Sequence, residues 1–188
     1  FKSIHNYRDF SQRIPVSSYE DYQGLIERSR KGEKNIFWPK PIKWFAKSSG
    51  TTNAKSKFIP VSLDSLEDCH YAAGKDLLCM YLNNNENSTL FNGKNLRLGG
   101  SNELYEENGT IFGDLSAILI HNMPFWAELS STPSNKVSLM SDWEYKMQAI
   151  VNETINENVT SLAGVPSWML VLLNNVLETS GSKTILDV

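Results

Sequence analysis

The stretch from Phe45 to Val61 gathers residue types suited to binding phosphate. Its central string is Ser48-Ser49-Gly50-Thr51-Thr52, and Lys55 and Lys57 follow closely. Phosphate is held by hydroxyl donors, by backbone N–H groups and by a nearby cation, and this stretch can supply all three. Gly50 lets the backbone approach an anion closely and take a positive φ without strain. The pattern predicts a phosphate-binding loop; the alternative is a solvated turn with incidental lysines.

Two short strands must hold this loop in place. Apolar residues lead into it at 42–46 and out of it at 58–61, which is typical of a hairpin with a polar connection. A nucleotide-binding loop of the Gly-x4-Gly-Lys-[Ser/Thr] type is the closest competing motif. It fails on spacing, because Gly50 is followed by four residues and then directly by Lys55, without a second glycine.

Composition restricts the class of protein. The chain has 188 residues, of which 40% are hydrophobic, and a formal net charge of −3. These values fit one domain with a sizeable core, and they give no electrostatic reason to expect nucleic acid or an anionic membrane as a partner. No apolar run reaches the 18 residues that suggest a membrane-spanning helix.

The two cysteines, Cys69 and Cys79, fall on one predicted helix. Ten residues of helix separate them by about 15 Å, too far for a disulfide bond. We expect two reduced and partly buried thiols, in a reducing, cytoplasmic compartment. His70 is the only nearby histidine and no second ligand pair follows, so no metal site is predicted.

Hydrophobic periodicity and capping residues predict the remaining elements. Helices are predicted over Tyr19–Arg30, Leu63–Leu82, Leu115–His121, Asp142–Asn156 and Ser167–Thr179, and further strands over Lys94–Gly99 and Val159–Gly164. The helix Leu63–Leu82 has a broad apolar face and is expected to be well buried. Residues 102–110 are polar and are expected to form a mobile surface excursion. The late alternation of helix, strand, Gly-Val-Pro turn and helix predicts an α/β fold without an internal domain boundary.

The loop and the later Gly164-Val165-Pro166-Ser167-Trp168 turn together resemble a known family. They are similar to the auxin-responsive acyl-acid–amido synthetases, members of the acyl-adenylate-forming superfamily. That family's loop reads Ser-Ser-Gly-Thr-[Ser/Thr]-x-Gly-x-x-Lys and runs into Phe-[Ile/Leu]-Pro. This chain matches it from Ser48 to Pro60, with Lys57 in the lysine position and Ala54 in place of the second glycine. The superfamily at large has its lysine one residue earlier, so the spacing favours the narrower family.

The resemblance implies an ATP- and Mg²⁺-dependent ligase. A carboxylic acid would form an acyl-adenylate, and an amine, typically an amino acid, would then displace AMP to give an amide. It implies that Ser48, Ser49, Gly50, Thr51, Thr52 and Lys57 contact the nucleotide phosphates. It also implies that Val165, Pro166 and Trp168 line the acid pocket, for which a buried helix start with a core tryptophan is the alternative. No catalytic residue is assigned.

The resemblance further implies that the chain is partial. Family members are about three times as long, and their adenine motif Tyr-x-Ser-[Ser/Ala]-Glu, ribose-binding aspartate and C-terminal lid have no counterpart in residues 1–188. The expected fold is therefore part of the large N-terminal adenylation domain, a mixed sheet flanked by helices, without the lid. Two alternatives stay open: a non-catalytic module that binds a phosphate-bearing ligand, and a plain globular domain with a polar hairpin.

Overall fold

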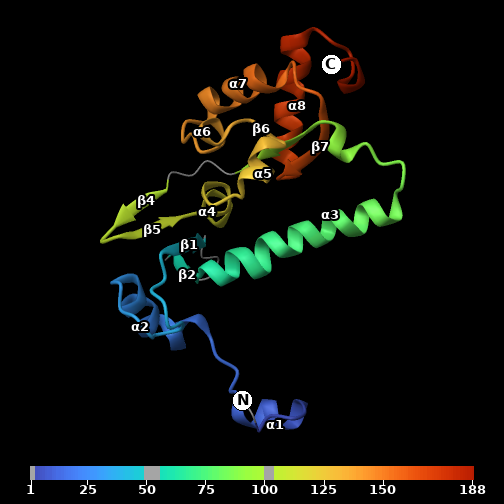
Figure 1. Ribbon diagram of the computed structural model, residues 1–188. Coiled ribbons are helices and arrows are strands. Elements are labelled where there is room, and N and C mark those ends of the chain that lie inside the picture. The colour runs from blue at the N-terminus through green and yellow to red at the C-terminus, as the bar shows by residue number, and fades with distance from the viewer. Residues whose placement is uncertain (1–2, 49–55, 100–103) are drawn as a thin grey trace.

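The computed structural model describes residues 3–48, 56–99 and 104–188 (Figure 1). The α-helices are α1 (Tyr7–Arg13), α2 (Tyr19–Arg30), α3 (Ala72–Asn84), α4 (Leu115–His121), α5 (Phe125–Leu129), α6 (Asn135–Ser138), α7 (Trp143–Thr154) and α8 (Pro166–Ser180). The strands are β1 (Trp44–Ser48), β2 (Lys57–Val61), β3 (Lys94–Leu98), β4 (Tyr105–Glu107), β5 (Thr110–Gly113), β6 (Ser131–Thr132) and β7 (Val159–Gly164). Shorter turns of π- or 3₁₀-helix are η1 (Ser65–Tyr71), η2 (Leu90–Asn92) and η3 (Ile185–Asp187). The α/β fold predicted from the sequence is confirmed.

Within the described residues the strands form two sheets, which we call sheet A and sheet B. Sheet A is mixed and has the order β2-β1-β5-β4: β1 pairs antiparallel with β2 and parallel with β5, while β4 and β5 are antiparallel. Sheet B has the order β6-β3-β7, and all its pairs are parallel. Helices flank both sheets, as the sequence analysis expected.

Strand β1 is apolar on both faces, which explains its place inside sheet A. Trp44 and Ala46 pack into one cluster with Leu66 and Ile118. Phe45 points the other way, is fully buried, and stacks on Phe112 with ring centroids 5.6 Å apart. A strand covered on both faces reads as a continuous apolar run rather than an alternating one, and this is the pattern of residues 42–46.

Sheet B packs one face against the helices α7 and α8. Leu96 and Leu98 of β3 alternate with polar Asn95 and Arg97, as period-two geometry requires. The two leucines belong to the largest apolar cluster, in which α7 and α8 cover the sheet with side chains that include Met147, Ile150, Val151, Met169 and Leu172. The helices form where predicted: Asp142 caps α7 by accepting from the Tyr145 N–H, and Gly181 ends α8 with a φ of 69°.

The expectation that the helix after the hairpin is well buried was wrong. It forms as the continuous pair η1 and α3, and Ser62 accepts from the Ser65 N–H at its start. However, α3 has no buried residue, and Leu77 and Met80 are 68% and 65% exposed. Cys69 and Cys79 are exposed free thiols rather than partly buried ones. Figure 1 shows why: α3 runs as a long rod whose outer side no described element covers.

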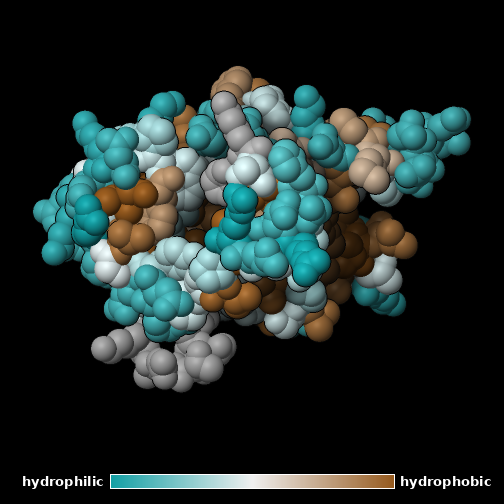
Figure 2. Space-filling model, turned by 90° about the horizontal axis from the view of Figure 1, so that it is seen from below, coloured by the Kyte–Doolittle hydropathy of each residue, from teal (hydrophilic) through white to brown (hydrophobic). Residues whose placement is uncertain are grey.

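Apolar side chains are open to solvent on the face seen in Figure 2, where brown surface lies between hydrophilic groups. The exposed apolar side chains of the described residues include Phe91 of η2 and Phe125, Trp126 and Leu129 of α5, in addition to those of α3. Single exposed apolar residues are ordinary on a protein surface, but a group of large ones indicates a surface with an occupant.

Residues 102–110 were expected to form a mobile surface excursion, and the described residues 105–109 are exposed, but they belong to regular structure. Residues 104–113 form the β4–β5 hairpin, and Tyr105 stacks on Phe112 at 5.2 Å. Its turn is Asn108-Gly109, with φ values of 53° and 78°. Positive φ at both central residues is the signature of the tightest hairpin turns, for which Asn-Gly is a preferred pair. This signal was present in the sequence and was overlooked.

No helix in the described part of the chain is long and apolar enough to cross a membrane.

Candidate functional site

The predicted hairpin around the phosphate-binding string is present. Register pairing runs from Trp44 opposite Val61 to Ser48 opposite Lys57, so the two ends of the connecting loop are cross-strand neighbours. Burial stops abruptly along β1, because Ala46 is buried while Lys47 and Ser48 are exposed. The apolar part of the strand therefore fixes the hairpin, and its polar end projects into solvent where a ligand can reach it.

The structure describes only the two ends of the predicted loop. Ser49, Gly50, Thr51, Thr52 and Lys55 lie outside the described residues. Their contribution to phosphate binding stays a prediction from the sequence. Ser48 and Lys57, the two members of the predicted set that the structure describes, lie side by side at the loop's base.

Lys57 is already engaged with an acidic residue. Its Nζ lies 3.3 Å from Oε1 of Glu20 and 5.0 Å from the centre of the Tyr19 ring. Tyr19 is itself held against the hairpin, because its Oη accepts from the Phe58 N–H at 2.9 Å. The pKa of Glu20 is lowered by a hydrogen bond from its own backbone, next by Lys57, and also by Ser18. Helix α2 thus presents a carboxylate to the one predicted phosphate-binding cation that the structure describes.

The second predicted site lies where β7 turns into α8. Val165 precedes the helix, and Pro166 is its first residue, one position before the start expected from the sequence. Gly164 is required by a close approach: a Cβ there would come 2.7 Å from the Leu98 carbonyl oxygen. Val165 is 44% exposed and Trp168 is 37% exposed. Trp168 packs edge-to-face on Trp143 at 5.3 Å, so it is partly used in joining α7 to α8.

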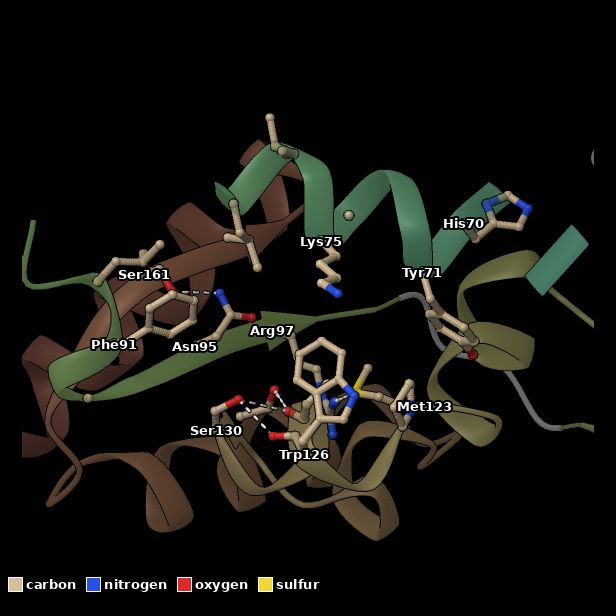
Figure 3. A pocket seen from close by; sticks show the side chains of 18 residues that line it. His70, Tyr71, Lys75, Phe91, Asn95, Arg97, Met123, Trp126, Ser130 and Ser161 are labelled. Atoms are coloured by element: carbon tan, nitrogen blue, oxygen red, sulfur yellow. Dashed lines mark hydrogen bonds between the residues drawn. The ribbon is translucent and has the colours of Figure 1, made fainter. Parts of the chain in front are cut away.

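Sequence reasoning missed a cavity of about 320 Å³ between α3 and the open face of sheet B. Lys75 of α3 and Arg97 of β3 line it, together with Phe91 and Trp126 (Figure 3). Neither Val165 nor any other residue of the predicted acid pocket is among the described residues that line it. The polar alternation of Asn95 and Arg97 in β3 was the available signal, since it marks a sheet face that apolar helices do not cover.

Arg97 is a buried cation beside this cavity, only 6% exposed. Its Nη2 donates to Oδ1 of Asn135 at 2.5 Å and to the Pro133 carbonyl at 3.4 Å, while its Nε has no partner within the described residues. Burial lowers the pKa of Arg97, and the charge of Glu128 opposes that shift. Because an arginine stays charged in proteins, its field persists at this sheet face.

Lys146 is a second buried cation, at the carboxyl edge of sheet B. It lies on α7, is fully buried, and donates from Nζ to the Gly99 carbonyl at 3.4 Å. Burial lowers its pKa. Gly99 directly follows β3, so this lysine ties α7 to the end of the strand.

Candidate metal ligands do not gather in the described residues: they contain no group of three or more His, Cys, Asp or Glu side chains arranged to hold a metal ion. Mg²⁺ in nucleotide sites is usually held by one or two carboxylates together with substrate phosphates. The hydroxyls and the lysine of the hairpin suit the phosphates rather than the metal.

Comparison with known proteins gives a consistent result. A family model described as the GH3 family N-terminal domain matches residues 1–187. The indole-3-acetic acid-amido synthetase GH3.15 of Arabidopsis thaliana is 34% identical over 61 residues, which are 32% of this chain and 10% of that protein. The probable indole-3-acetic acid-amido synthetase GH3.2 of Oryza sativa subsp. japonica is 41% identical over 59 residues, 31% of this chain and 10% of that protein.

Solved structures show the same relationship at the level of the fold. AtGH3.15 acyl acid amido synthetase in complex with 2,4-DB superposes with a TM-score of 0.71 and 23% identity, covering 93% of this chain and 31% of that one. A second structure, GH3.15 acyl acid amido synthetase, gives 0.70 and 21%, with 92% and 31% covered. The chain therefore spans about a third of the length of the solved structures that it matches.

Proposed function

The chain belongs to the GH3 family, matching its N-terminal domain, and from this we propose that it is the phosphate-binding part of an ATP-dependent ligase that joins a carboxylic acid to an amino acid. One observation carries the proposal. The string from Ser48 to Lys57 has the composition of a phosphate loop, and its two ends meet at the open end of a hairpin. Its relatives named as amido synthetases make acid–amine ligation the reaction to test.

The proposed reaction has two steps. In the first, a carboxylate oxygen attacks the α-phosphorus of ATP, the bond to the β-phosphate breaks, and pyrophosphate leaves. In the second, the amine nitrogen attacks the acyl carbon, the carbon–oxygen bond to AMP breaks, and the amine loses a proton. Both steps place charge on phosphoryl oxygens, so preorganised donors and cations lower the barrier.

In this proposal the hairpin supplies one side of the phosphate site. The hydroxyls of Ser48, Ser49, Thr51 and Thr52 and the backbone at Gly50 donate to the phosphates. Lys57 neutralises charge, and to do so it exchanges Glu20 for a phosphate oxygen. Mg²⁺ bound with the nucleotide would supply further positive charge to the phosphates. Val165, Pro166 and Trp168 would border the acid, because they follow the carboxyl end of a parallel strand, where ligands of α/β folds usually bind.

We further propose that this chain is a partial adenylation domain. The adenine pocket, the ribose-binding carboxylate and the lid would come from polypeptide beyond the 188 residues, which cover 31% of the solved relatives. The exposed thiols of Cys69 and Cys79 suit a reducing cytoplasm, in which they would not be oxidised.

Pyrophosphate exchange tests the proposal. A longer protein that contains this chain should exchange labelled pyrophosphate into ATP only in the presence of its acid, so a panel of carboxylic acids both tests the reaction and identifies the substrate. The 188-residue chain alone should show no exchange and little or no binding of ATP and Mg²⁺ in calorimetry. Micromolar ATP binding without exchange in the longer protein would instead support a non-catalytic phosphate-binding module. Exchange or amide formation by the short chain would show that it is not partial.

A further inference from the structure

Tyr19, the first residue of α2, contacts the hairpin at the point where strand β2 begins. We propose that Tyr19 is a positioning residue for phosphate binding: its hydroxyl fixes the backbone at Phe58, and thereby the direction in which Lys57 faces the phosphates. The inference rests on the proposed function, because it concerns the same phosphate site. It adds a residue outside the loop motif, 39 positions before Phe58 in the chain.

The hydroxyl of Tyr19 contacts both backbone groups of a single residue. Its Oη accepts from the Phe58 N–H at 2.9 Å, and its O–H donates to the Phe58 carbonyl oxygen at 3.4 Å. Within the described residues β2 is at the edge of sheet A, so no neighbouring strand pairs with its outer backbone groups. The hydroxyl therefore satisfies this edge in the place that a further strand would take.

The Phe58 N–H belongs to the same peptide unit as the Lys57 carbonyl. Because a peptide unit is planar, a partner that fixes this N–H also fixes the direction of the bond to the Lys57 Cα. Lys57 is the first residue of β2, so its backbone sets the direction in which the chain enters the strand from the loop. The Tyr19 ring lies 5.0 Å from the Lys57 Nζ. Both the backbone and the side chain of Lys57 are therefore held against Tyr19.

The position of Tyr19 is fixed by the helix that carries it. Asp21 accepts from the Ser18 N–H at 2.7 Å, which closes the first turn of α2 around Tyr19. The Tyr19 ring also packs against one of the buried apolar clusters. At the other end of α2, the Cζ of Arg30 lies 3.9 Å from the centre of the Phe58 ring. Helix α2 is thus attached to Phe58 from both of its ends.

Two simpler roles compete with positioning. One is protection of the β2 edge against pairing with another chain, and the other is general stabilisation of the fold. Loss of edge protection would produce self-association, and loss of stability would lower the fraction of folded, active protein. Neither would alter the affinity of the folded protein for phosphate, whereas a displaced Lys57 would.

The first test is kinetic and uses a longer, active protein that contains this chain. Tyr19→Phe removes only the hydroxyl and keeps the ring beside Lys57. We expect the KM for ATP in pyrophosphate exchange to rise about 3- to 10-fold, the scale of one lost hydrogen bond. The KM for the acid should not change. A merely structural loss would instead lower the maximal rate and leave both KM values as they were.

A double-mutant cycle shows whether the effect passes through Lys57. In a Lys57→Ala background, Tyr19→Phe should change the KM for ATP by less than about 2-fold, because the residue that it orients is already absent. Additive effects of the two substitutions would overturn the proposal. Tyr22→Phe is the matched control: it removes an exposed hydroxyl from the same helix, one without a hydrogen bond within the described residues, and should change nothing.

Hydrogen exchange tests the contact itself, without ATP or activity. In the 188-residue protein, Tyr19→Phe should accelerate exchange of the Phe58 amide proton at least about 5-fold, because its acceptor is lost. The Leu98 amide in the central strand of sheet B should keep its rate, which excludes global unfolding as the cause. Unchanged exchange at Phe58, or an unchanged KM for ATP in the longer protein, would overturn the proposal.

Failure of the proposed function would be recognised separately. If the longer parent protein shows no pyrophosphate exchange with any acid, the ligase proposal fails, and calorimetry with inorganic tripolyphosphate then decides the positioning role. Tyr19→Phe should weaken tripolyphosphate binding about 3- to 10-fold, again the scale of one hydrogen bond. Equal binding by the variant, or no binding by the parent, would overturn the role of Tyr19.

Discussion

Sheet B and the hairpin of sheet A place polar side chains in different ways. In sheet B one face is packed by α7 and α8, and polar side chains such as Arg97 stand on the other face. In β1 both faces are buried up to Ala46, and polar residues begin only where the packing ends. A strand that is packed on both faces can place polar side chains only at its end. A sheet that is packed against helices on one face can place them across its other face. The first arrangement is readable from the sequence as a motif, whereas the second leaves only the polar alternation of β3 as a signal.

The largest expected effect is a difference in stability between two leucine-to-alanine variants, one in the apolar cluster that packs on sheet B and one on the exposed helix α3. Leu172→Ala removes a fully buried side chain of the largest cluster and should lower the free energy of unfolding by about 2–5 kcal/mol. Leu77→Ala, at 68% exposure on α3, should change it by no more than about 0.5 kcal/mol. Denaturant unfolding followed by circular dichroism measures both. A large loss for Leu77→Ala would mean that α3 is covered in solution.

The next effect concerns activity at the end of β1. Ser49→Ala combined with Thr51→Ala, in a longer protein with ligase activity, should reduce pyrophosphate exchange at least about 10²-fold, because preorganised phosphate donors are lost. Stability should stay within about 0.5 kcal/mol of the parent, because the proposal assigns these hydroxyls to the ligand and not to the core. Near-normal exchange in the double variant would show that this loop does not bind the phosphates.

A smaller effect distinguishes the two lysines after the string. Lys57→Ala should lower ATP-dependent exchange about 10-fold and more than Lys55→Ala does, because Lys57 occupies the family's lysine position and lies opposite Ser48. Steady-state exchange rates at several ATP concentrations would separate an effect on binding from one on turnover. If the two variants have equal effects, or if Lys55→Ala has the larger one, Lys57 has been wrongly matched to the lysine of the family's loop.

The smallest effect tests whether Glu20 competes with phosphate for Lys57. In a longer protein that contains this chain, Glu20→Gln should raise ATP affinity about 2- to 3-fold in calorimetry, the scale of an exposed ion pair. Since the pKa of Glu20 is lowered in the folded protein, the ion pair is present above the ordinary carboxyl pKa and is lost as pH falls through the lowered one. The variant and the parent should therefore converge once the pH falls below this lowered pKa. Glu178→Gln, on α8, is the control and should bind ATP like the parent.

Local signals predicted much of this molecule. The hairpin strands, the caps at Asp142 and Ser62, the first helical position of Pro166 and the stop at Gly181 all follow from neighbouring residues. The phosphate-binding role of the string at 48–57 was predicted from residue type and stays a prediction, because most of the string lies outside the described residues.

Non-local features were missed for a physical reason. Strand β5 is only four residues long, and its parallel pairing with β1 joins segments more than sixty positions apart. Periodicity predicted an apolar helix over η1 and α3 but could not say whether anything covers it. The cavity depends on where α3 lies relative to β3, and neither segment alone contains that information.

The contact at Gly164 has a consequence for engineering the turn that follows it. A side chain there would meet the backbone of Leu98, so β7 would have to move before any other residue could be accepted. Val165 and Trp168 are partly exposed and have no such restriction. In a saturation library, position 164 should tolerate a single amino acid while positions 165 and 168 accept many. The sheet thus fixes the position at which the turn begins, and the residues after Gly164 can be varied without moving that position.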